Sequence, residues 1–303
     1  MPQPAADIAL LTERRFDVPA AAADDWYLAN ILREDQLLAD ALRRHGLASM
    51  RVDWARPDID WSRFRLAVFR TTWDYFDRFD EFTAWLARAE QQTALCNRPS
   101  IIRWNMDKHY LGDLEAKGIP IVPCRFIERG AAITLAELLD ATRWHDAIIK
   151  PCVSGGARHT YRVNRANAAQ IDAVVRPLLA AESFILQPFM RDIVERGEDT
   201  LVVLNGRYTH AVRKSVKPGD FRVQDEHGGR VRAHEPTPDQ IELAERAMGA
   251  CDPAPAYGRV DMVRDNEGRL AVMELELIEP ELWLRTHPSA ALPLAEAIAR
   301  EAC

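Results

Sequence analysis

Apolar residues along this chain follow two different spacings. Short apolar runs at Ile8–Leu11 and Leu66–Phe69 have the length of buried strands. The stretch Asp24–His45 repeats apolar residues every three or four positions and is followed by Gly46, a pattern that predicts a long amphipathic helix. A second helix is predicted at Glu81–Ala89. Alternating strands and helices of this kind are typical of α/β architecture.

The tripeptide Asn97-Arg98-Pro99 interrupts this pattern, and we expect a domain boundary there. Strands and helices resume after the break. The predicted helices are Asn105–Lys117, Leu135–Ala141 and Ala166–Leu179, and the predicted strands are Ile121–Ile127, Ala147–Lys150, Thr160–Val163 and Phe184–Met190.

From Thr200 onward the pattern changes to antiparallel hairpins. Asn205-Gly206 separates two apolar runs and is the strongest short hairpin signal, because both residues readily adopt the positive φ angles of a tight turn. The predicted strands are Leu201–Leu204, Tyr208–Val212, Tyr257–Arg264 and Leu270–Ile278, and the predicted helices are Pro238–Gly249 and Ser289–Glu301.

The composition argues against several classes of protein. A net charge of −7 over 303 residues is unlike a nucleic-acid-binding protein, which normally has a basic surface. No apolar run approaches the roughly 20 residues that span a bilayer, and Met1–Asp7 lacks the basic and apolar regions of a signal peptide. The five cysteines form no CxxC pair, so we expect reduced cysteines in a cytoplasmic protein rather than disulfides or a zinc site.

The strand predicted at Leu270–Ile278 carries two acids on one face. Alternation places Glu274 and Glu276 on the same face, about 7 Å apart at Cα. The opposite face is then apolar and belongs to the core, with Ala271, Met273, Leu275 and Leu277.

A third acid joins this face if the hairpin register is simple. When Arg264 pairs with position 269, Asp261 lies opposite Val272. It is then diagonal to Glu274. Three crowded carboxylates repel one another unless a cation neutralises them, and Mg²⁺ prefers such oxygen ligands. The alternative is a solvated strand face on which Arg259 and Glu274 form an ordinary salt bridge, and the hairpin alone does not decide between the two.

Two further segments are suited to a nucleotide. The strand ending at Lys150 leads into Ser154-Gly155-Gly156, where backbone amides and a lysine could bind a polyphosphate. The spacing is not that of a Walker A motif, and the glycines could equally form a simple turn. Phe184–Met190 reads either as a kinked core strand or as a linker that offers backbone groups to adenine.

The order of these pieces resembles the ATP-grasp superfamily from about Asn97 to the end. The matching segments are "KGIPIVP", "IIKPCVSGGARHT", "ILQPFM", "YGRVDMV" and "VMELELIEP", similar to bacterial glutathione synthetase and the ribosomal-protein glutamate ligases. Three others, "RTTWDYFDRFDEFTAWL", "RWNMDKHYLGDL" and "ELELIEPELWL", resemble a subgroup that includes the cycloserine-forming cyclo-ligase.

This resemblance implies an α/β ATP-grasp fold behind an N-terminal, Rossmann-like pre-ATP-grasp domain. The expected domains are residues 1–98, a central subdomain with the phosphate-binding loop at 99–185, and a C-terminal subdomain with the metal site at 186–303.

The resemblance also implies roles for single residues. Lys108 and Lys150 would contact phosphates, with the loop Ser154, Gly155 and Gly156 closing over them. Adenine would be held by Gln187, Phe189 and Met190, and the ribose by Glu198. The metal ligands would be Asp261, Glu274 and Glu276, and the basic residues near the transferred phosphate and the acyl substrate would be Arg213 and Arg222. Many relatives have asparagine in place of Glu276, so the number of metal ions is left open.

The implied activity is ATP-dependent joining of a carboxylate to an amine, or ring closure, through an acyl phosphate. Mg²⁺ is the expected cofactor beside ATP, with Mn²⁺ as a substitute, and the expected substrate is a small amino-acid-like molecule, with neither nucleic acid nor membrane as partner. A homo-oligomer is left open. The alternatives are an ATP-dependent small-molecule kinase, which releases no free phosphate, and a non-catalytic nucleotide-binding module.

We expect the substrate between the N-terminal domain and the C-terminal sheet, near Arg70, Trp73, Arg285 and His287. The glycine-containing, charged segments Ser154–His159 and Pro218–Gly229 are expected to be mobile without nucleotide. The second contains His227, the one histidine for which we consider a catalytic role.

Overall fold

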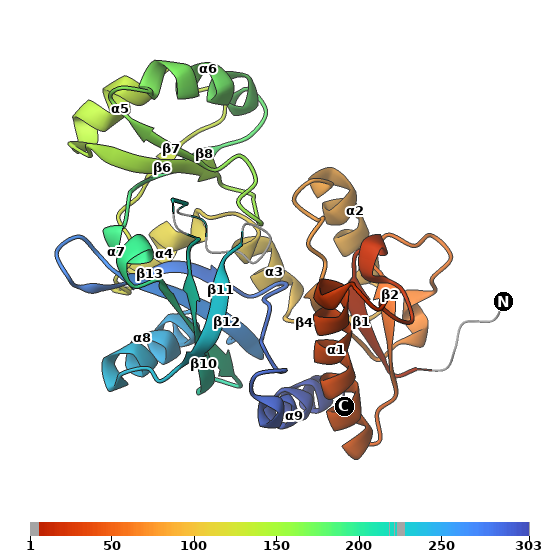
Figure 1. Cartoon of the computed structure of the whole chain (residues 1–303). Coiled ribbons are helices and arrows are strands. Elements are labelled where there is room, and N and C mark those ends of the chain that lie inside the picture. Colours follow the sequence, from red (N-terminus) through yellow and green to blue (C-terminus); the bar gives the residue numbers. More distant parts are fainter. Residues whose placement is uncertain (1–5, 218, 221, 223–227, 303) are drawn as a thin grey trace.

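A computed structural model describes residues 6–217, 219–220, 222 and 228–302. The described chain forms three separate β-sheets with helices packed around them (Figure 1). This confirms the predicted α/β class. Within these residues, no helix combines the length and the apolar character needed to cross a membrane.

The N-terminal part folds around a four-stranded parallel sheet. In spatial order its strands are β2 (Ser49–Asp53), β1 (Ile8–Thr12), β3 (Leu66–Thr71) and β4 (Ala94–Cys96). The chain leaves β1 toward one side and returns to β3 on the other, so the strand order reverses between these two strands. Ligands of open α/β sheets bind outside the carboxyl ends of the strands at such a switch point. Glu13 and Trp73 follow β1 and β3 there.

The helices of this part, α1 (Trp26–Arg44) and α2 (Phe79–Ala89), agree with the prediction to within two residues at each end. The side chain of Asp25 caps α1 by accepting a hydrogen bond of 2.9 Å from the amide of Leu28. Strands β2 and β4 were not predicted. β2 is largely polar and half-buried, and β4 has only three residues, so neither gives a clear apolar pattern.

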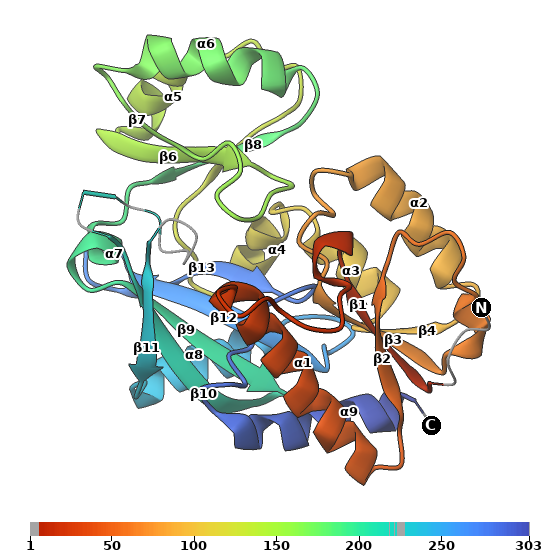
Figure 2. The same cartoon turned by 45° about the vertical axis from the view of Figure 1, so that its right-hand side comes forward.

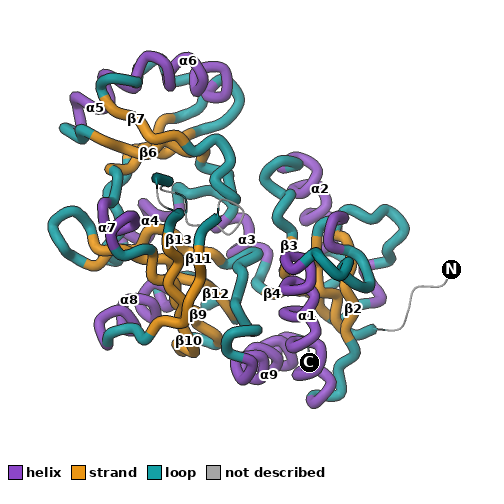
Figure 3. The backbone as a smooth tube through the Cα atoms, in the orientation of Figure 1, coloured by secondary structure: helices purple, strands orange, loops and turns teal. Residues whose placement is uncertain are grey.

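The central part is a four-stranded antiparallel sheet. Its order is β5 (Arg125–Ile127), β8 (Phe184–Pro188), β6 (Asp146–Pro151) and β7 (Tyr161–Asn164). Two helices, α5 (Leu135–Thr142) and α6 (Ala168–Leu179), pack on one face of it (Figure 3). The other face is turned toward the rest of the molecule (Figure 1). Lys150 lies near the end of β6.

The single helix predicted at Asn105–Lys117 is wrong. The structure has two short helices, α3 (Pro99–Asn105) and α4 (Tyr110–Ala116), with Lys108 in the break between them. Hydrogen bonds outside the helices account for the break. The amide of Lys108 donates to the carbonyl of Cys152 at 2.9 Å, and the side chain of Asn105 binds the backbone of a distant strand.

The strand predicted at Ile121–Ile127 begins only at Arg125. The preceding residues pair with the C-terminal sheet instead. Val122 donates its amide to the carbonyl of Val272, and the amide of Val272 donates to the carbonyl of Pro120, both at 2.9 Å. Pro123, which lacks an N–H, separates this pairing from β5.

The C-terminal part is a five-stranded antiparallel sheet. Its order is β11 (Arg230–His234), β10 (Arg207–Ser215), β9 (Glu198–Leu204), β12 (Tyr257–Arg264) and β13 (Leu270–Glu276). The helices of this part are α7 (Arg191–Glu195), α8 (Pro238–Gly249) and α9 (Ala291–Glu301). The predicted hairpin at Asn205-Gly206 is confirmed, with φ angles of 53° and 73°. Helix α9 lies against α1 and joins the C-terminal sheet to the N-terminal part in one apolar cluster (Figure 2).

The predicted register of the β12–β13 hairpin is wrong by one residue. Arg264 pairs with Leu270, and a bulge at Met273 brings Asp261 opposite Glu274 rather than opposite Val272. The bulge also changes the faces of β13. Val272 joins Leu275 and Leu277 in the core, while Ala271 and Met273 turn to the other side. Bulges are frequent next to active sites because they redirect side chains.

Candidate active site

A cavity of about 590 Å³ is lined by residues from all three parts of the chain. Lys150 and Gln187 reach it from the central sheet, Asp261 and Glu274 from the C-terminal sheet, and Trp73 from the loop after β3. The cavity therefore contains the switch point of the N-terminal sheet and most of the residues predicted to bind nucleotide and metal.

Two lysines converge on one carboxylate in this cavity. Lys108 Nζ lies 3.0 Å from Glu274 Oε1, and Lys150 Nζ lies 3.9 Å from Glu274 Oε2. Burial by itself would raise the pKa of Glu274, but the positive charges of the two lysines outweigh it and lower that pKa to about 2. Burial lowers the pKa of Lys150. Two ammonium groups held by one carboxylate are well placed to bind an anion such as a phosphate.

A second ion-pair network lies beside the first. Arg259 donates to Asp261 Oδ1 at 2.9 Å and Oδ2 at 2.8 Å, and its guanidinium also contacts Glu276. Lys214 Nζ lies 2.8 Å from Asp261 Oδ2. Burial opposes ionisation of Asp261, yet Arg259 and Lys214 together lower its pKa. The alternative salt bridge between Arg259 and Glu274 is therefore wrong, because Arg259 pairs with the other two acids.

Glu276 is the least compensated of the three predicted metal ligands. Burial raises its pKa to about 7 although the charge of Arg259 lowers it, and repulsion from Asp261 and Glu274 adds to the increase. Asp261 and Glu274 face each other across the hairpin, and all three acids line the cavity. The structure thus brings the three acids together despite the different register. A divalent cation would neutralise the remaining repulsion.

Two side chains fix the backbone of β13 beneath these acids. The amide group of Asn105 donates to the carbonyl of Leu275 and accepts from the amide of Leu277, both at 2.8 Å. The hydroxyl of Tyr110 accepts from the amide of Leu275 at 2.9 Å. Asn105 and Tyr110 are buried and come from α3 and α4, so the helices that flank Lys108 also hold the acidic strand.

The predicted phosphate-binding loop lies over the lysines. The carbonyl of Ser154 accepts a hydrogen bond of 2.7 Å from Lys108 Nζ. Gly155 packs against the N-terminal domain so closely that a Cβ there would lie 2.5 Å from Cε1 of Phe76. Gly156 has a φ angle of 56°, in the region that favours glycine. The predicted mobility of Ser154–His159 stays a prediction.

The segment after β8 contributes Gln187, Pro188 and Met190 to the cavity. Among the residues described, none provides a hydrogen-bond partner for the side-chain nitrogen of Gln187, which is buried. Phe189 does not line the cavity. Its ring faces away and stacks under the guanidinium of Arg162, 3.8 Å from the ring centroid, so the structure does not support its predicted contact with adenine.

Of the two predicted catalytic arginines, the structure brings only one to the cavity. Arg222 lines it and pairs with Asp220 at 2.7 Å. Arg213 points to the opposite face of β10, where it binds Asp199 at 2.5 Å. Strand alternation instead turns Lys214, from the same basic cluster, into the cavity.

Glu198 lines the cavity too, but its carboxylate contacts Lys214. Burial raises the pKa of Glu198 despite that contact. In the structure the carboxylate of Glu198 is paired with Lys214. The predicted contact of Glu198 with a ribose stays a prediction.

The predicted substrate residues have different surroundings. Trp73 lines the cavity. Arg70 is buried and pairs with Asp35 at 3.0 Å, so it stabilises the N-terminal domain. Arg285 pairs with Glu34 at 3.1 Å and with a glutamate of its own loop. The remaining residue, His287, stacks on His210 with ring centroids 5.0 Å apart. His227 and most of Pro218–Gly229 lie outside the described residues.

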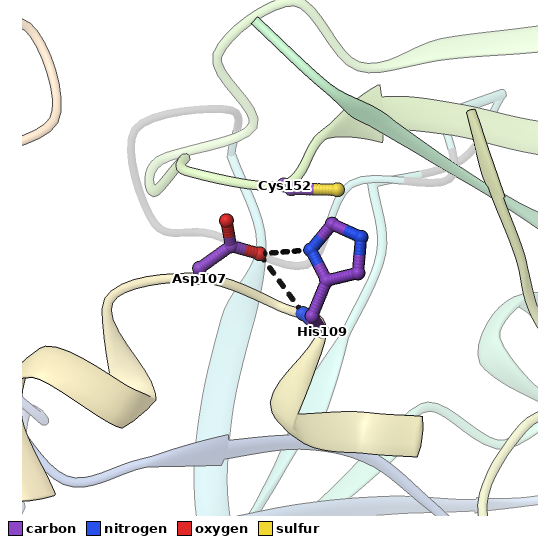
Figure 4. A group of neighbouring side chains, drawn as sticks. All are labelled: Asp107, His109 and Cys152. Atoms are coloured by element: carbon purple, nitrogen blue, oxygen red, sulfur yellow. Dashed lines mark hydrogen bonds and ion pairs between the residues drawn. The ribbon is translucent and has the colours of Figure 1, made fainter. Parts of the chain in front are cut away.

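Asp107, His109 and Cys152 form a compact group beside Lys108, with their potential ligand atoms within 4.8 Å of one another (Figure 4). His109 Nδ1 lies 2.6 Å from Asp107 Oδ1, and Nε2 lies 3.2 Å from Glu128 Oε1. Burial lowers the pKa of His109, but these two carboxylates outweigh it and the pKa is raised. Because both ring nitrogens have carboxylate partners, we interpret the group as a support for the Lys108 loop rather than as a metal centre.

The cavity residues fit a nucleoside triphosphate with a divalent cation. Lys108 and Lys150 offer charge for phosphates, and the buried amide nitrogen of Gln187 could donate to a heterocyclic base. The acids Glu274 and Glu276 offer oxygen ligands for a hard cation at the same end of the cavity.

Comparisons with known proteins agree with this geometry. The family model of the N-terminal domain of D-cycloserine synthetase DcsG matches residues 8–97, and that of the ATP-grasp domain of prokaryotic glutathione synthetase matches residues 132–251. Cycloserine biosynthesis protein DcsG from Streptomyces lavendulae is 32% identical over 282 residues, covering 86% of this chain and 91% of that protein.

Solved structures give the same result. The crystal structure of D-cycloserine synthetase DcsG is similar with a TM-score of 0.86 and 30% identity, covering 98% of this chain and 99% of that one. A RimK-domain ATP-grasp protein from Sphaerobacter thermophilus has a TM-score of 0.66 at 19% identity, with 98% and 99% covered. D-alanine–D-alanine ligase from Bacillus anthracis has a TM-score of 0.66 at 14% identity, with 98% and 97% covered. The predicted ATP-grasp fold with a separate N-terminal domain is confirmed.

Proposed function

Because this chain belongs to the DcsG family of ATP-grasp ligases, it is an ATP-dependent, ADP-forming ligase, and we propose that it closes a ring within one small substrate. In this proposal the substrate carboxylate becomes an acyl phosphate, and a nitrogen of the same molecule displaces phosphate to form a C–N bond. The product is cycloserine or a cyclic amide of the same kind. We also retain the division into residues 1–98, 99–185 and 186–303 as a proposal.

The observation that carries the proposal is the Lys108–Glu274–Lys150 cluster at the edge of the acidic strand. When bound, ATP supplies the phosphoryl group and Mg²⁺ neutralises its charge. With ATP bound, Lys108 and Lys150 would contact phosphate oxygens in place of Glu274, and the Glu274 carboxylate would then be available to hold the cation. Phosphoryl transfer needs positioning and charge neutralisation rather than a protein nucleophile, and this cluster provides both.

We propose Glu274 and Glu276 as the principal metal ligands. Asp261 accepts hydrogen bonds from the side chains of Arg259 and Lys214. It becomes a third metal ligand only if one of these two side chains releases it. Lys214 takes the place predicted for Arg213 near the transferred phosphate, and Arg222 lies near the acyl group. The nucleotide base is assigned to Gln187 and Met190, the ribose to Glu198, and the phosphates to Ser154–Gly156.

The similarity to D-cycloserine synthetase DcsG favours ring closure within one molecule over the joining of two molecules. The match to cycloserine biosynthesis protein DcsG extends over both the N-terminal domain and the ATP-grasp region. The substrate end of the cavity lies between these two regions, where Trp73 of the N-terminal part meets the loop after β13. The whole substrate-binding region therefore belongs to the part shared with this relative.

Turnover with linear serine derivatives tests this function. The purified chain is incubated with ATP, Mg²⁺ and a panel of serines that carry nitrogen on the side-chain oxygen, in both enantiomeric forms. We expect ADP and free phosphate in equal amounts and a cyclised product by mass spectrometry, and none of these with Lys150→Ala. A phosphorylated product without free phosphate would indicate a kinase instead, and nucleotide binding without turnover on any of these compounds would contradict the ring-closing function.

A further inference from the structure

The substrate end of the cavity, between the N-terminal part and the C-terminal sheet, is formed by two loops. The first follows β3 at the switch point of the N-terminal sheet and contains Trp73. The second follows β13 and contains Glu279 and Glu281. Trp73 joins the loops, because its indole Nε1 donates a hydrogen bond of 2.9 Å to the backbone carbonyl of Glu279.

The carboxylates at this end differ in their partners. Glu13 lies beside the guanidinium of Arg15 at 2.5 Å, and Glu281 lies 2.6 Å from Arg285. No lysine, arginine or histidine within the described part of the chain makes an ion pair with Glu279. Burial, with added repulsion from Glu276, raises the pKa of Glu279 to about 8, although the positive charges of Lys108 and Arg259 offset this increase in part. A partly buried carboxylate that faces a cavity without an ion-pair partner destabilises the folded protein unless a ligand compensates it.

The neighbouring wall is aromatic. The Trp73 ring packs edge-on against Phe16, with centroids 5.5 Å apart, and Tyr27 lies 6.3 Å away. Tyr27 and Trp73 both line the cavity. Aromatic faces next to a carboxylate favour an organic cation, whose apolar carbon atoms contact the rings while its charge meets the carboxylate.

We propose that the carboxylate of Glu279 binds a primary ammonium group of the substrate, with Trp73 positioning the loop that carries it. This inference rests on the proposed ligase function, because it concerns the same cavity. An ammonium group supplies the missing counter-charge and offers three N–H donors.

This assignment narrows the substrate class. The carboxylate to be activated must reach the phosphate end, at Lys108 and Glu274, while Glu279 binds a cation at the substrate end. A substrate that satisfies both ends is an amino acid whose own amino group is retained for recognition. A simple carboxylic acid of the same size would leave Glu279 without its counter-charge and would bind more weakly.

Calorimetric titration of D-cycloserine into the full chain with ADP and Mg²⁺ tests this subsite. Isoxazolidin-3-one, the same ring without the amino group, is the matched ligand. We expect the wild-type chain to bind D-cycloserine roughly tenfold or more tightly, the effect of one charge-assisted hydrogen bond. Glu279→Gln should remove this difference and leave ADP affinity unchanged. Glu296→Gln, on the exposed face of α9, should keep the difference.

Two results overturn the subsite while leaving ring closure intact: equal affinity of both rings for the wild-type chain, or a difference that survives in Glu279→Gln. If the wild-type chain binds neither ring, the proposed product is wrong.

The subsite is then tested by titrating the chain with ethylammonium and following the NMR resonance of the Trp73 indole N–H. A shift of this resonance in the wild-type chain but not in Glu279→Gln supports the ammonium site. No shift in the wild-type chain overturns it.

Discussion

Glu274 Oε1 lies 3.0 Å from Lys108 Nζ, although the two residues belong to different parts of the chain. Lys108 sits in a break between two helices, and the same helices bind the backbone of the strand that carries Glu274. The position of the lysine and that of the acid are therefore fixed by one set of hydrogen bonds. This pair joins a proposed phosphate-binding lysine to a proposed metal ligand.

Glu274→Gln should abolish turnover and also destabilise the protein without nucleotide. Glutamine cannot neutralise Lys108 and Lys150, so two ammonium groups would be left close together with no counter-charge. The sequence alone does not predict this pairing of Glu274 with the two lysines. Thermal melts with and without ATP and Mg²⁺, beside an ADP-release assay, measure both effects. Glu267→Gln, in the exposed turn of the same hairpin, is the control. An active variant with unchanged magnesium dependence would exclude the metal assignment.

Lys150→Ala should weaken ATP binding by roughly 1.5–3 kcal/mol, the contribution of a hydrogen bond to a charged group. The lysine is largely buried and has a lowered pKa, so its charge is better satisfied by phosphates than by the single carboxylate of Glu274. Isothermal titration calorimetry measures the change. Lys117→Ala is the control, because Lys117 donates to the backbone carbonyl of Ala250 at the end of α8 and does not line the cavity. Unchanged ATP affinity in Lys150→Ala would rule out the phosphate contact.

Residue types and motif order predicted the identity of the site better than its geometry. Lys150, Gln187, Glu274 and Glu276 all line one cavity, because strand ends and strand alternation place such residues reliably. The sequence did not predict Arg259 as a partner of two metal-site acids, because that pairing depends on a bulge at Met273. A one-residue bulge in so short a strand leaves no clear periodic signal in the sequence.

Side-chain partners explain why two predicted site residues lie outside the cavity. Arg213 and Phe189 have the expected residue types but do not line the cavity. Asp199, on the neighbouring strand of the same hairpin, holds the arginine, and Arg162 holds the phenylalanine. Glu279 was overlooked for the opposite reason, since nothing local marks a carboxylate that lacks a partner. Tertiary contacts decide these cases, and a single sequence does not contain them in readable form.

Gly155→Ala should lower turnover more than it lowers stability. Its Cβ would lie 2.5 Å from Phe76 Cε1, so the loop over the lysines could not keep its contact with the N-terminal domain. We expect a higher KM for ATP, and partial recovery when Phe76→Ala is added, because the smaller side chain makes room for the methyl group. Hydrogen exchange of Ser154–His159 with an ATP analogue and Mg²⁺ reports loop closure directly. If the double variant is no better than Gly155→Ala alone, the contact with Phe76 is not the cause.

The stability of the nucleotide-free protein should fall as the pH rises from about 5 to about 8. Burial raises the pKa of Glu276 to about 7 and that of Glu279 to about 8, from ordinary values of 4.5. Across this range the unfolded chain has already released these protons while the folded chain still holds them, so folding is favoured at the lower pH and loses that advantage as the carboxyls ionise. Glu276→Gln removes one of the two titrations and should show a shallower decrease in Tm, whereas Glu296→Gln should follow the wild-type curve. ADP with Mg²⁺ should also flatten the wild-type curve, because a cation stabilises the ionised acid. A wild-type Tm that stays level or rises over this range, with the same curve for Glu276→Gln, would contradict the crowded-acid interpretation of the site.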